Sequence, residues 1–154
     1  MKLQRILSDP PVNPIKMRLS ERCLSYARDN GVPVSLIATL DECAYAESIQ
    51  IGRLCLSPLA ELDLENQFEE NRPCAEHGFL IVGSGLNGDP IVLELSSGQM
   101  AFISHDLLWE RHYQDFEECV VRSPFQFHDF WRAALEDGDF PVDSQGAAEA
   151  CRSE

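Results

Sequence analysis

Three glycines in one short stretch have the spacing of a turn that holds the phosphates of a nucleotide. Gly83, Gly85 and Gly88 form a G-x-G-x-x-G pattern directly after an apolar run. In dinucleotide-binding proteins such a turn leads from a strand into a helix, whose free N–H groups bind the pyrophosphate. Asp89 can cap a helix, and Asp106 lies near the distance at which a ribose-binding acid follows the turn. A small nucleotide-binding enzyme is therefore one hypothesis.

The residues after the glycines argue against that hypothesis. Residues 91–95, IVLEL, are rich in β-branched side chains and show no helical stripe, and a Ser-Ser-Gly turn at 96–98 follows them immediately. A crossover helix on a parallel sheet needs roughly ten residues or more. We therefore predict that 91–95 is a strand. The glycines then close a hairpin between antiparallel strands, because such turns visit left-handed backbone conformations.

Two shorter patterns contain the residue types of a hydrolase triad and of a metal site. In Ser104-His105-Asp106, consecutive strand residues would point to opposite faces, so His105 cannot pair with both neighbours. We predict a strand end followed by a turn. Cys74 and His77 form C-x-x-H, half of a zinc site, but nothing in the spacing brings further ligands to them. The sequence predicts no catalytic residue, no metal and no cofactor.

Two more histidines have acidic neighbours in the sequence. His112 follows Glu110, and His128 precedes Asp129. Nearby carboxylates favour the protonated imidazole. We interpret both histidines as part of solvated helix faces.

Acidic residues are the strongest candidates for binding a partner. The chain holds 12 basic and 26 acidic residues, a net charge of −14. This balance argues against nonspecific binding to nucleic acid and favours rapid capture of a basic partner. The densest acidic run lies within 57–76, which we predict to be a polar surface connection. The candidate partner-binding residues are Glu61, Asp63, Glu65, Glu69 and Glu70, with Asp89 and Glu94 extending the patch.

The hydrophobic pattern predicts an α+β fold that positions these residues. We expect an antiparallel sheet with strands near 49–56, 79–83, 91–95 and 99–104, packed against helices near 20–30, 35–47 and 123–137. The last helix has the clearest signal, because Ser123, Pro124 and Gln126 match a capping box. Its aromatic stripe, Phe127, Phe130 and Trp131, is interpreted as core.

The length and composition predict one globular domain. We expect an N-terminal arm at 1–18, a single α+β domain at 19–138 and a flexible tail at 139–154. The six cysteines include no C-x-x-C pair. The sequence shows no signal-peptide pattern and no apolar run near the 18 or so residues that span a bilayer. These features predict a cytoplasmic protein with reduced thiols.

The order of elements resembles the SMI1/KNR4 (SUKH) superfamily over about 49–137. The resemblance is carried by packing and turn motifs, FLIVG at 79–83, NGDPIVL at 87–93, GQMAF at 98–102 and SPFQFHDF at 123–130. It implies an antiparallel sheet backed by helices and no enzyme activity. Bacterial members are mostly immunity proteins that bind and silence a toxin, often a nuclease.

The sequence therefore favours three hypotheses for the function. The first is a non-enzymatic bacterial immunity protein whose acidic surface occludes a basic toxin. The second is a regulatory or scaffolding module that binds an ordinary cellular protein. The third is the small enzyme that would use the turn from Gly83 to Gly88. The expected partner is a protein, with no direct contact to nucleic acid or to a membrane.

Overall fold

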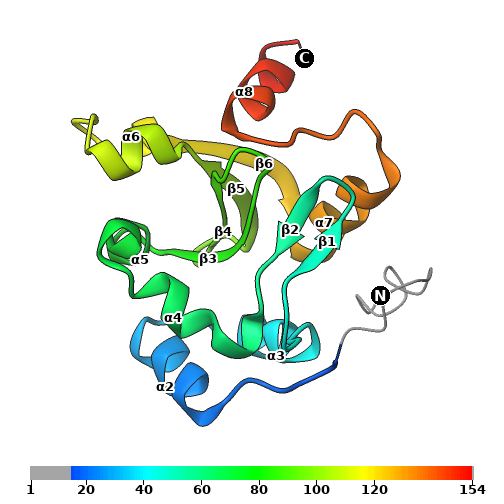
Figure 1. Ribbon diagram of the computed structural model, residues 1–154. Helices are drawn as coiled ribbons and strands as arrows, with labels where there is room; N and C mark the ends of the chain where they lie inside the picture. Colours follow the sequence, from blue (N-terminus) through cyan, green and yellow to red (C-terminus); the bar gives the residue numbers. More distant parts are fainter. Residues whose placement is uncertain (1–14, 154) are drawn as a thin grey trace.

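A single antiparallel sheet organises the computed structural model, which describes residues 15–153 (Figure 1). Its six strands lie in chain order, so each strand pairs with its neighbour in the sequence. The strands are β1 (Ile49–Ile51), β2 (Leu54–Leu56), β3 (Phe79–Ser84), β4 (Pro90–Glu94), β5 (Gln99–Ile103) and β6 (Val120–Gln126). The predicted strand at 91–95 and its antiparallel pairing with 79–83 are confirmed.

Helices precede the sheet, interrupt it and follow it. The α-helices are α2 (Glu21–Asp29), α3 (Val34–Glu42), α4 (Leu62–Asn66), α5 (Arg72–Glu76), α6 (His105–Glu110), α7 (Phe127–Glu136) and α8 (Ser144–Arg152). Three 3-10 turns, η1 (Leu59–Glu61), η2 (Glu69–Asn71) and η3 (Phe116–Cys119), lie between them. The predicted α+β class is confirmed. Within 15–153, no helix combines the length and apolar character that crossing a membrane requires.

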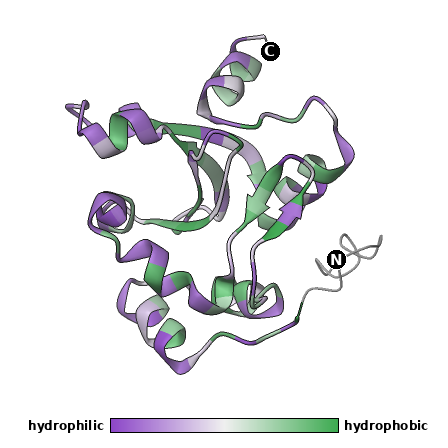
Figure 2. Ribbon diagram, in the orientation of Figure 1, coloured by the Kyte–Doolittle hydropathy of each residue, from purple (hydrophilic) through white to green (hydrophobic). Residues whose placement is uncertain are grey.

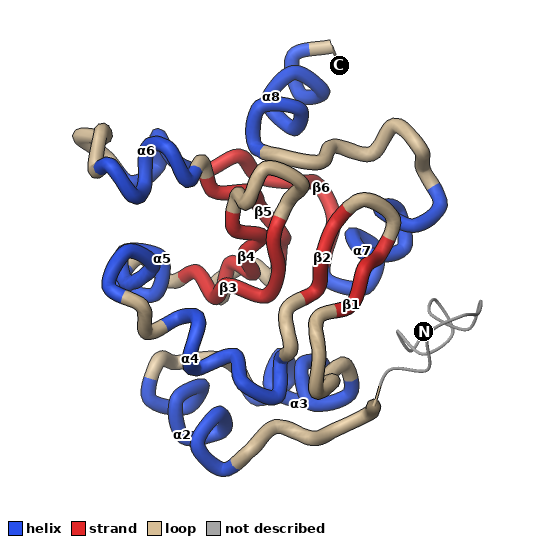
Figure 3. Tube along the Cα trace, in the orientation of Figure 1, coloured by secondary structure: helices blue, strands red, loops and turns tan. Residues whose placement is uncertain are grey.

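Both faces of the sheet are buried, which explains why its central strands are almost continuously apolar. In β3, Leu80 and Val82 join the main core with α2, α3 and α7, whereas Phe79 and Ile81 face a second core under α5, α6 and η3. The two groups alternate because successive strand residues point to opposite faces. Figure 3 shows the strands between α5 and α7. Hydrophobic residues are concentrated along the strands in Figure 2.

The segment between β2 and β3 is folded against the sheet, so the prediction of a polar surface connection at 57–76 is wrong. Leu59, Leu62 and Cys74 are buried. Asn66 of α4 is also buried and replaces a neighbouring strand along β3. Its Oδ1 accepts the N–H of Ile81 at 2.7 Å, and its Nδ2 donates to the Ile81 carbonyl at 3.0 Å. Along β3, β2 pairs only with Gly83 and Ser84. The side chain of Asn66 therefore satisfies the main-chain N–H and C=O of Ile81, which β2 does not reach.

The predicted helix at 123–137 begins four residues late. Residues 120–126 form the edge strand β6, and the Ser123 hydroxyl accepts the N–H of Phe125 at 3.1 Å inside that strand. Pro124 suits an edge strand, where a missing N–H removes no ladder bond. The register shifts between Gln99 and Ala101, opposite this stretch. The residues that matched a capping box therefore lie in β6, where the pairing with β5 is irregular, and α7 begins at Phe127.

Two other predicted elements differ from the structure. The expected strand at 49–56 is a hairpin, because Gly52 turns the chain with φ +61° between β1 and β2. The expected helix at 35–47 begins at Val34 and ends at Glu42, with Pro33 in place of Ser35 at its N-cap. The helix at 20–30 is found as α2, and Ser20 caps it as expected.

The ends of the chain were predicted to be an arm and a flexible tail. Most of the arm, 1–14, lies outside the described residues. In the tail, α8 is packed against β5 and β6, with Phe140 and Ala147 buried. Its first turn is capped by Asp143, whose Oδ1 accepts the N–H of Gly146 at 2.7 Å. The small residues of the tail therefore lie in a helix that packs on the sheet rather than in a loose segment.

The glycines of the G-x-G-x-x-G pattern are explained by close packing and by the hairpin turn. A Cβ on Gly83 would lie 2.4 Å from the Cys55 carbonyl oxygen and 2.8 Å from the Trp131 ring, and one on Gly85 would lie 2.4 Å from the Val142 oxygen. Gly88 has φ +93°. The amides of Gly85, Leu86 and Gly88 donate to main-chain carbonyls. These amides are therefore not free to bind a phosphate.

The close approach at Gly83 gives a stability prediction. We expect Gly83→Ala to lower the free energy of unfolding by about 2–3 kcal/mol, because the new methyl group must displace β2 or Trp131. Gly138→Ala is the matched control, since a Cβ there meets nothing within 4 Å. It should change stability by less than about 0.5 kcal/mol. Urea unfolding measures both, and equal stability of the two variants would contradict the packing explanation.

Candidate functional site

The structure separates the acidic residues that the sequence grouped into one patch. Asp63 is buried at the start of α4, where Oδ1 accepts the Cys23 thiol at 2.8 Å and Oδ2 pairs with Arg22 Nε at 2.6 Å. This carboxylate therefore joins α4 to α2. Its predicted role in binding a partner is wrong, because a buried and paired carboxylate offers little to a second protein.

Asp89 is likewise buried, and it connects three elements. It ends the glycine turn before β4, and its Oδ1 accepts the main-chain N–H of His105 at 3.0 Å and lies 2.5 Å from His105 Nδ1. Its Oδ2 accepts the N–H of Ser144 at 2.8 Å. Burial raises the pKa of Asp89, but the hydrogen bonds from His105 and Ser144 outweigh it and leave that pKa below its ordinary value. Asp89 holds the first residues of α6 and α8, so its predicted surface role is also wrong.

His105 lies between a buried and an exposed carboxylate. Opposite Asp89, its Nε2 is 3.1 Å from Asp106 Oδ1, whose side chain is 80% exposed, against 2% for that of Asp89. The predicted turn after Ser104 is instead the helix α6. The Ser104 main-chain N–H donates to the Cys119 carbonyl at 2.8 Å. The ring of His105 thus contacts one of its sequence neighbours, Asp106. Within residues 15–153, the polar contacts of this ring are with carboxylates, and His105 forms no hydrogen-bonded pair with Ser104.

Glu94 forms an ion pair with an arginine of the neighbouring part of the sheet. Arg122 of β6 contacts Glu94 at 2.8 Å and Glu117 at 2.7 Å, and the Ser97 hydroxyl donates to Glu94 at 2.7 Å. The Arg122 hydrogen bonds hold the pKa of Glu94 below its ordinary value. Glu94 belongs to this cross-strand ion-pair group and does not extend the acidic patch as predicted.

The remaining acidic candidates lie on η1, α4 and η2. Glu61, Glu69 and Glu70 are exposed, and Glu65 is half-buried. Burial raises the pKa of Glu65, although a hydrogen bond with Ser57 opposes this. These four residues are the part of the predicted surface that the structure keeps accessible.

Exposed apolar side chains accompany these glutamates, and the sequence analysis missed them. Leu64 is 45%, Phe68 56% and Trp109 46% exposed. Phe68 follows α4, and Trp109 lies on α6. We define the aromatic–acidic face as Leu64, Phe68 and Trp109 with Glu65, Glu69, Glu70, Asp106 and Glu110. Glu61 lies instead in a pocket that Arg18 and Arg22 also line. The available signal was an apolar residue, Phe68, inside an otherwise charged run.

Asn71 holds the two aromatic parts of this face together. It is the last residue of η2 and is buried. Its Nδ2 donates to the Glu65 carbonyl at 3.0 Å, and its Oδ1 accepts the indole N–H of Trp109 at 3.3 Å. The main-chain N–H of Asn71 also donates to the Phe68 carbonyl at 2.9 Å. The ring of His105 lies 4.8 Å from that of Trp109. The indole is therefore oriented by α6 and η2 before any partner arrives. Figure 1 shows α4, α5 and α6 along one side of the sheet.

The half zinc motif and the other histidines have structural surroundings. Cys74 is buried, which raises its pKa to about 12, and His77 stacks on Phe116 with ring centroids 4.3 Å apart. Among residues 15–153, no three potential ligands gather in a way that would hold a metal ion. His112 is exposed and lies 3.2 Å from Glu110. His112 is solvated but lies beyond the end of α6, whereas His128 lies on α7 and burial lowers its pKa, so the prediction of a solvated helix face fits neither histidine fully.

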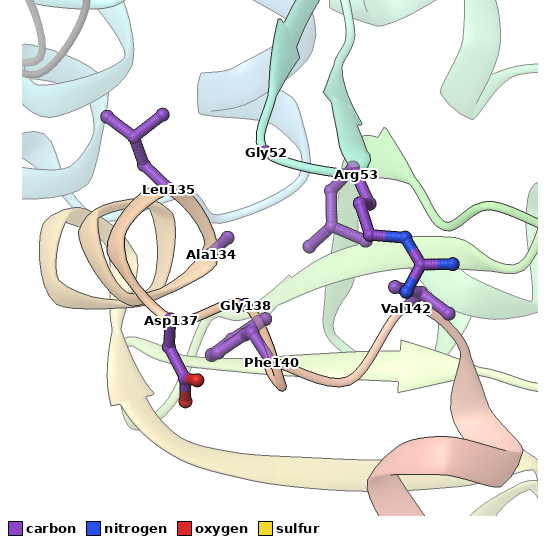
Figure 4. Close-up of a pocket in the computed structure, with 9 residues that line it drawn as sticks. Gly52, Arg53, Ala134, Leu135, Asp137, Gly138, Phe140 and Val142 are labelled. Atoms are coloured by element: carbon purple, nitrogen blue, oxygen red, sulfur yellow. The ribbon is translucent and has the colours of Figure 1, made fainter.

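A small pocket lies where the β1–β2 turn meets the end of α7. Figure 4 shows Arg53 beside Gly52 on one side and Asp137 and Phe140 on the other. Its volume is about 90 Å³. Sites for small molecules and cofactors usually measure about 300–1,000 Å³. The pocket therefore lacks the room that a nucleotide requires.

Comparisons of the chain with protein-family models, with curated proteins and with solved structures find no match. The resemblance to the SUKH superfamily therefore stays a prediction.

The buried carboxylate of Asp89 gives a second stability prediction. We expect Asp89→Asn to lower the free energy of unfolding by about 2–4 kcal/mol, because an amide cannot accept all the donors of His105 and Ser144. Asp106→Asn is the matched control, since this exposed carboxylate touches the same histidine. It should cost less than about 0.5 kcal/mol. Chemical denaturation at pH 7 compares the two variants, and equal losses would show that burial of Asp89 is unimportant.

The lowered pKa of Asp89 also fixes the pH dependence of this stabilisation. The pKa of an unfolded aspartate is about 3.9, and the folded pKa of Asp89 lies below its ordinary value. The stabilisation is therefore fully present above about pH 5 and is lost as the pH falls through the folded pKa. Denaturation of the wild type and of Asp89→Asn from pH 6 to pH 2.5 should show their difference shrinking at the acid end. A difference that grows on acidification would contradict this sign.

Proposed function

We propose that this chain is a non-enzymatic protein-binding module that uses its aromatic–acidic face to bind a basic protein, most simply as a toxin-neutralising immunity protein of the SUKH type. The observation that carries the proposal is the exposure of Phe68 and Trp109 beside accessible carboxylates, Glu69 and Glu70 above all. Aromatic anchors supply much of the binding energy of protein interfaces. Surrounding charges of one sign select the partner and speed its association.

The distribution of charge supports a basic partner rather than an acidic one. The face contains five carboxylates, on Glu65, Glu69, Glu70, Asp106 and Glu110, and the chain as a whole carries −14. Such a surface repels nucleic acid, and it is complementary to the basic groove with which a nuclease binds phosphates. Occlusion of that groove would silence the nuclease without any chemistry by this chain.

The aromatic anchors provide the first test of the function. We expect Trp109→Ala and Phe68→Ala each to weaken binding of the captured partner by about 2 kcal/mol, roughly thirtyfold, because both remove apolar area at the centre of the face. Leu135→Ala is the control, since Leu135 is similarly exposed on α7. The partner is captured from the native host, or produced from a neighbouring toxin gene, and its affinity is measured by calorimetry. Unchanged affinity of both aromatic variants would refute this face.

The carboxylates provide a second test, on association kinetics. Glu69→Lys combined with Glu70→Lys should slow association about tenfold and leave dissociation nearly unchanged, because these charges steer the encounter. Glu47→Lys with Glu136→Lys changes the net charge equally outside the face. The wild-type association rate should fall with added salt, since charges are screened within about 8 Å at physiological ionic strength. An association rate that ignores both salt and the reversed charges would count against a basic partner.

The identity of the captured protein separates immunity from regulation. A toxin whose activity is abolished in the complex supports the immunity role. An ordinary cellular protein bound through the same residues supports the regulatory role. Capture of an acidic protein would contradict the proposal in both forms.

A further inference from the structure

A second surface lies between β6, the loop at 137–141 and α8. It is a groove of about 270 Å³ that shares no residue with the aromatic–acidic face. Phe102, Phe125 and Phe140 contribute aromatic rings to its lining, together with Pro124 and Pro141. Drug-sized ligands occupy about 300–1,000 Å³. The groove lies just below this range, and it has room for one large apolar side chain.

The sequence explains why this space is left open. α8 lines the groove with Ala147, Ala150 and Cys151, whose small side chains recur at helical spacing and do not fill the space above the phenylalanine rings. Phe140 is fixed from below by Phe130, with ring centroids 5.1 Å apart. The N-terminus of α8 is held by Asp89 and Asp143. Both walls are therefore formed before an occupant arrives.

The charges at the rim select the sign of an occupant. Asp137 and Asp139 are exposed there, and among the described residues neither has an ion pair with a basic side chain. Arg122 also lines the groove, but Glu94 and Glu117 bind it from β4 and η3. The groove is thus apolar within and negative at its edge. A cation beside the apolar group is favoured there, and an anion is repelled.

We propose that this groove binds a segment of a partner protein that inserts one aromatic side chain flanked by lysine or arginine. The ring packs on Phe125 and Phe140, and the flanking cation meets Asp137 or Asp139. Binding here needs no residue of the aromatic–acidic face, so the proposal stands apart from the proposed function. A free small molecule is an outcome of the test rather than a second proposal.

Capped tripeptides provide the direct test on the full chain. Acetyl-Lys-Phe-Lys-amide should shift the amide NMR signals of Phe125, Phe140 and Ala150 and bind at least about tenfold more tightly than acetyl-Glu-Phe-Glu-amide, because the rim charges attract one and repel the other. Acetyl-Lys-Ala-Lys-amide, which lacks the ring, should bind more weakly than the first peptide. No shift at these residues, or equal affinity for the two charged peptides, would overturn the proposal. An uncharged aromatic compound that binds as tightly as the basic peptide would also overturn it.

Variants of the groove sharpen the result. Ala150→Phe fills the groove from the exposed side of α8 and should abolish the shifts, whereas Glu149→Gln, the neighbouring residue, should preserve them. Asp137→Asn with Asp139→Asn should remove most of the preference for the basic peptide.

If Ala150→Phe disturbs the fold, alkylating the exposed Cys151 with a bulky maleimide blocks the same space in the wild type. Retained binding after that alkylation would refute the site. All these variants should leave binding at the aromatic–acidic face unchanged, so the two proposals fail separately.

Discussion

The buried carboxylate of Asp89 is the constraint on which both candidate surfaces depend. One oxygen holds the start of α6, which carries Trp109, and the other holds the start of α8, which forms a wall of the groove. Neither helix has a strong apolar face of its own, since Leu108 in α6 and Ala147 in α8 are their buried apolar residues. Short helices are marginal without tertiary contacts. A carboxylate at both N-termini supplies the acceptor that their free N–H groups need.

Several other carboxylates are also used within the fold. Asp41 accepts the N–H of Leu19 at 2.9 Å and fixes the chain ahead of α2. Asp63 joins α2 to α4, and Glu94 and Glu117 share Arg122 across the sheet. The formal charge of −14 therefore overstates what the surface offers to a partner at any one place. What matters for the proposed recognition is the local set of exposed carboxylates, and these lie beside Phe68 and Trp109 and, separately, at Asp137 and Asp139.

The sequence was sufficient to predict the elements whose pattern is local. The central strands 79–83, 91–95 and 99–104 were found because β-branched runs bounded by turn residues are typical of strands, and α2 was found from Ser20 and Gly31. The prediction failed where a local signal competed with pairing. Ser123-Pro124 has the composition of a helix start, but β5 recruits it as an edge strand with a bulge. The burial of Asp63 and Asp89 depends on residues distant in sequence, Cys23 and Ser144, so no local pattern reveals it.

The difference between a merely exposed indole and a binding anchor lies in its prior ordering. Single exposed apolar residues are common on proteins and need no function. Trp109 differs because its N–H is bonded to Asn71 and its ring lies against His105, which Asp89 holds in turn. A side chain fixed in this way loses less conformational entropy when a partner covers it. Leu135, exposed to a similar degree on α7, has no polar group with which to be fixed. Ordering of an exposed tryptophan by these polar contacts is what the proposed interface would require.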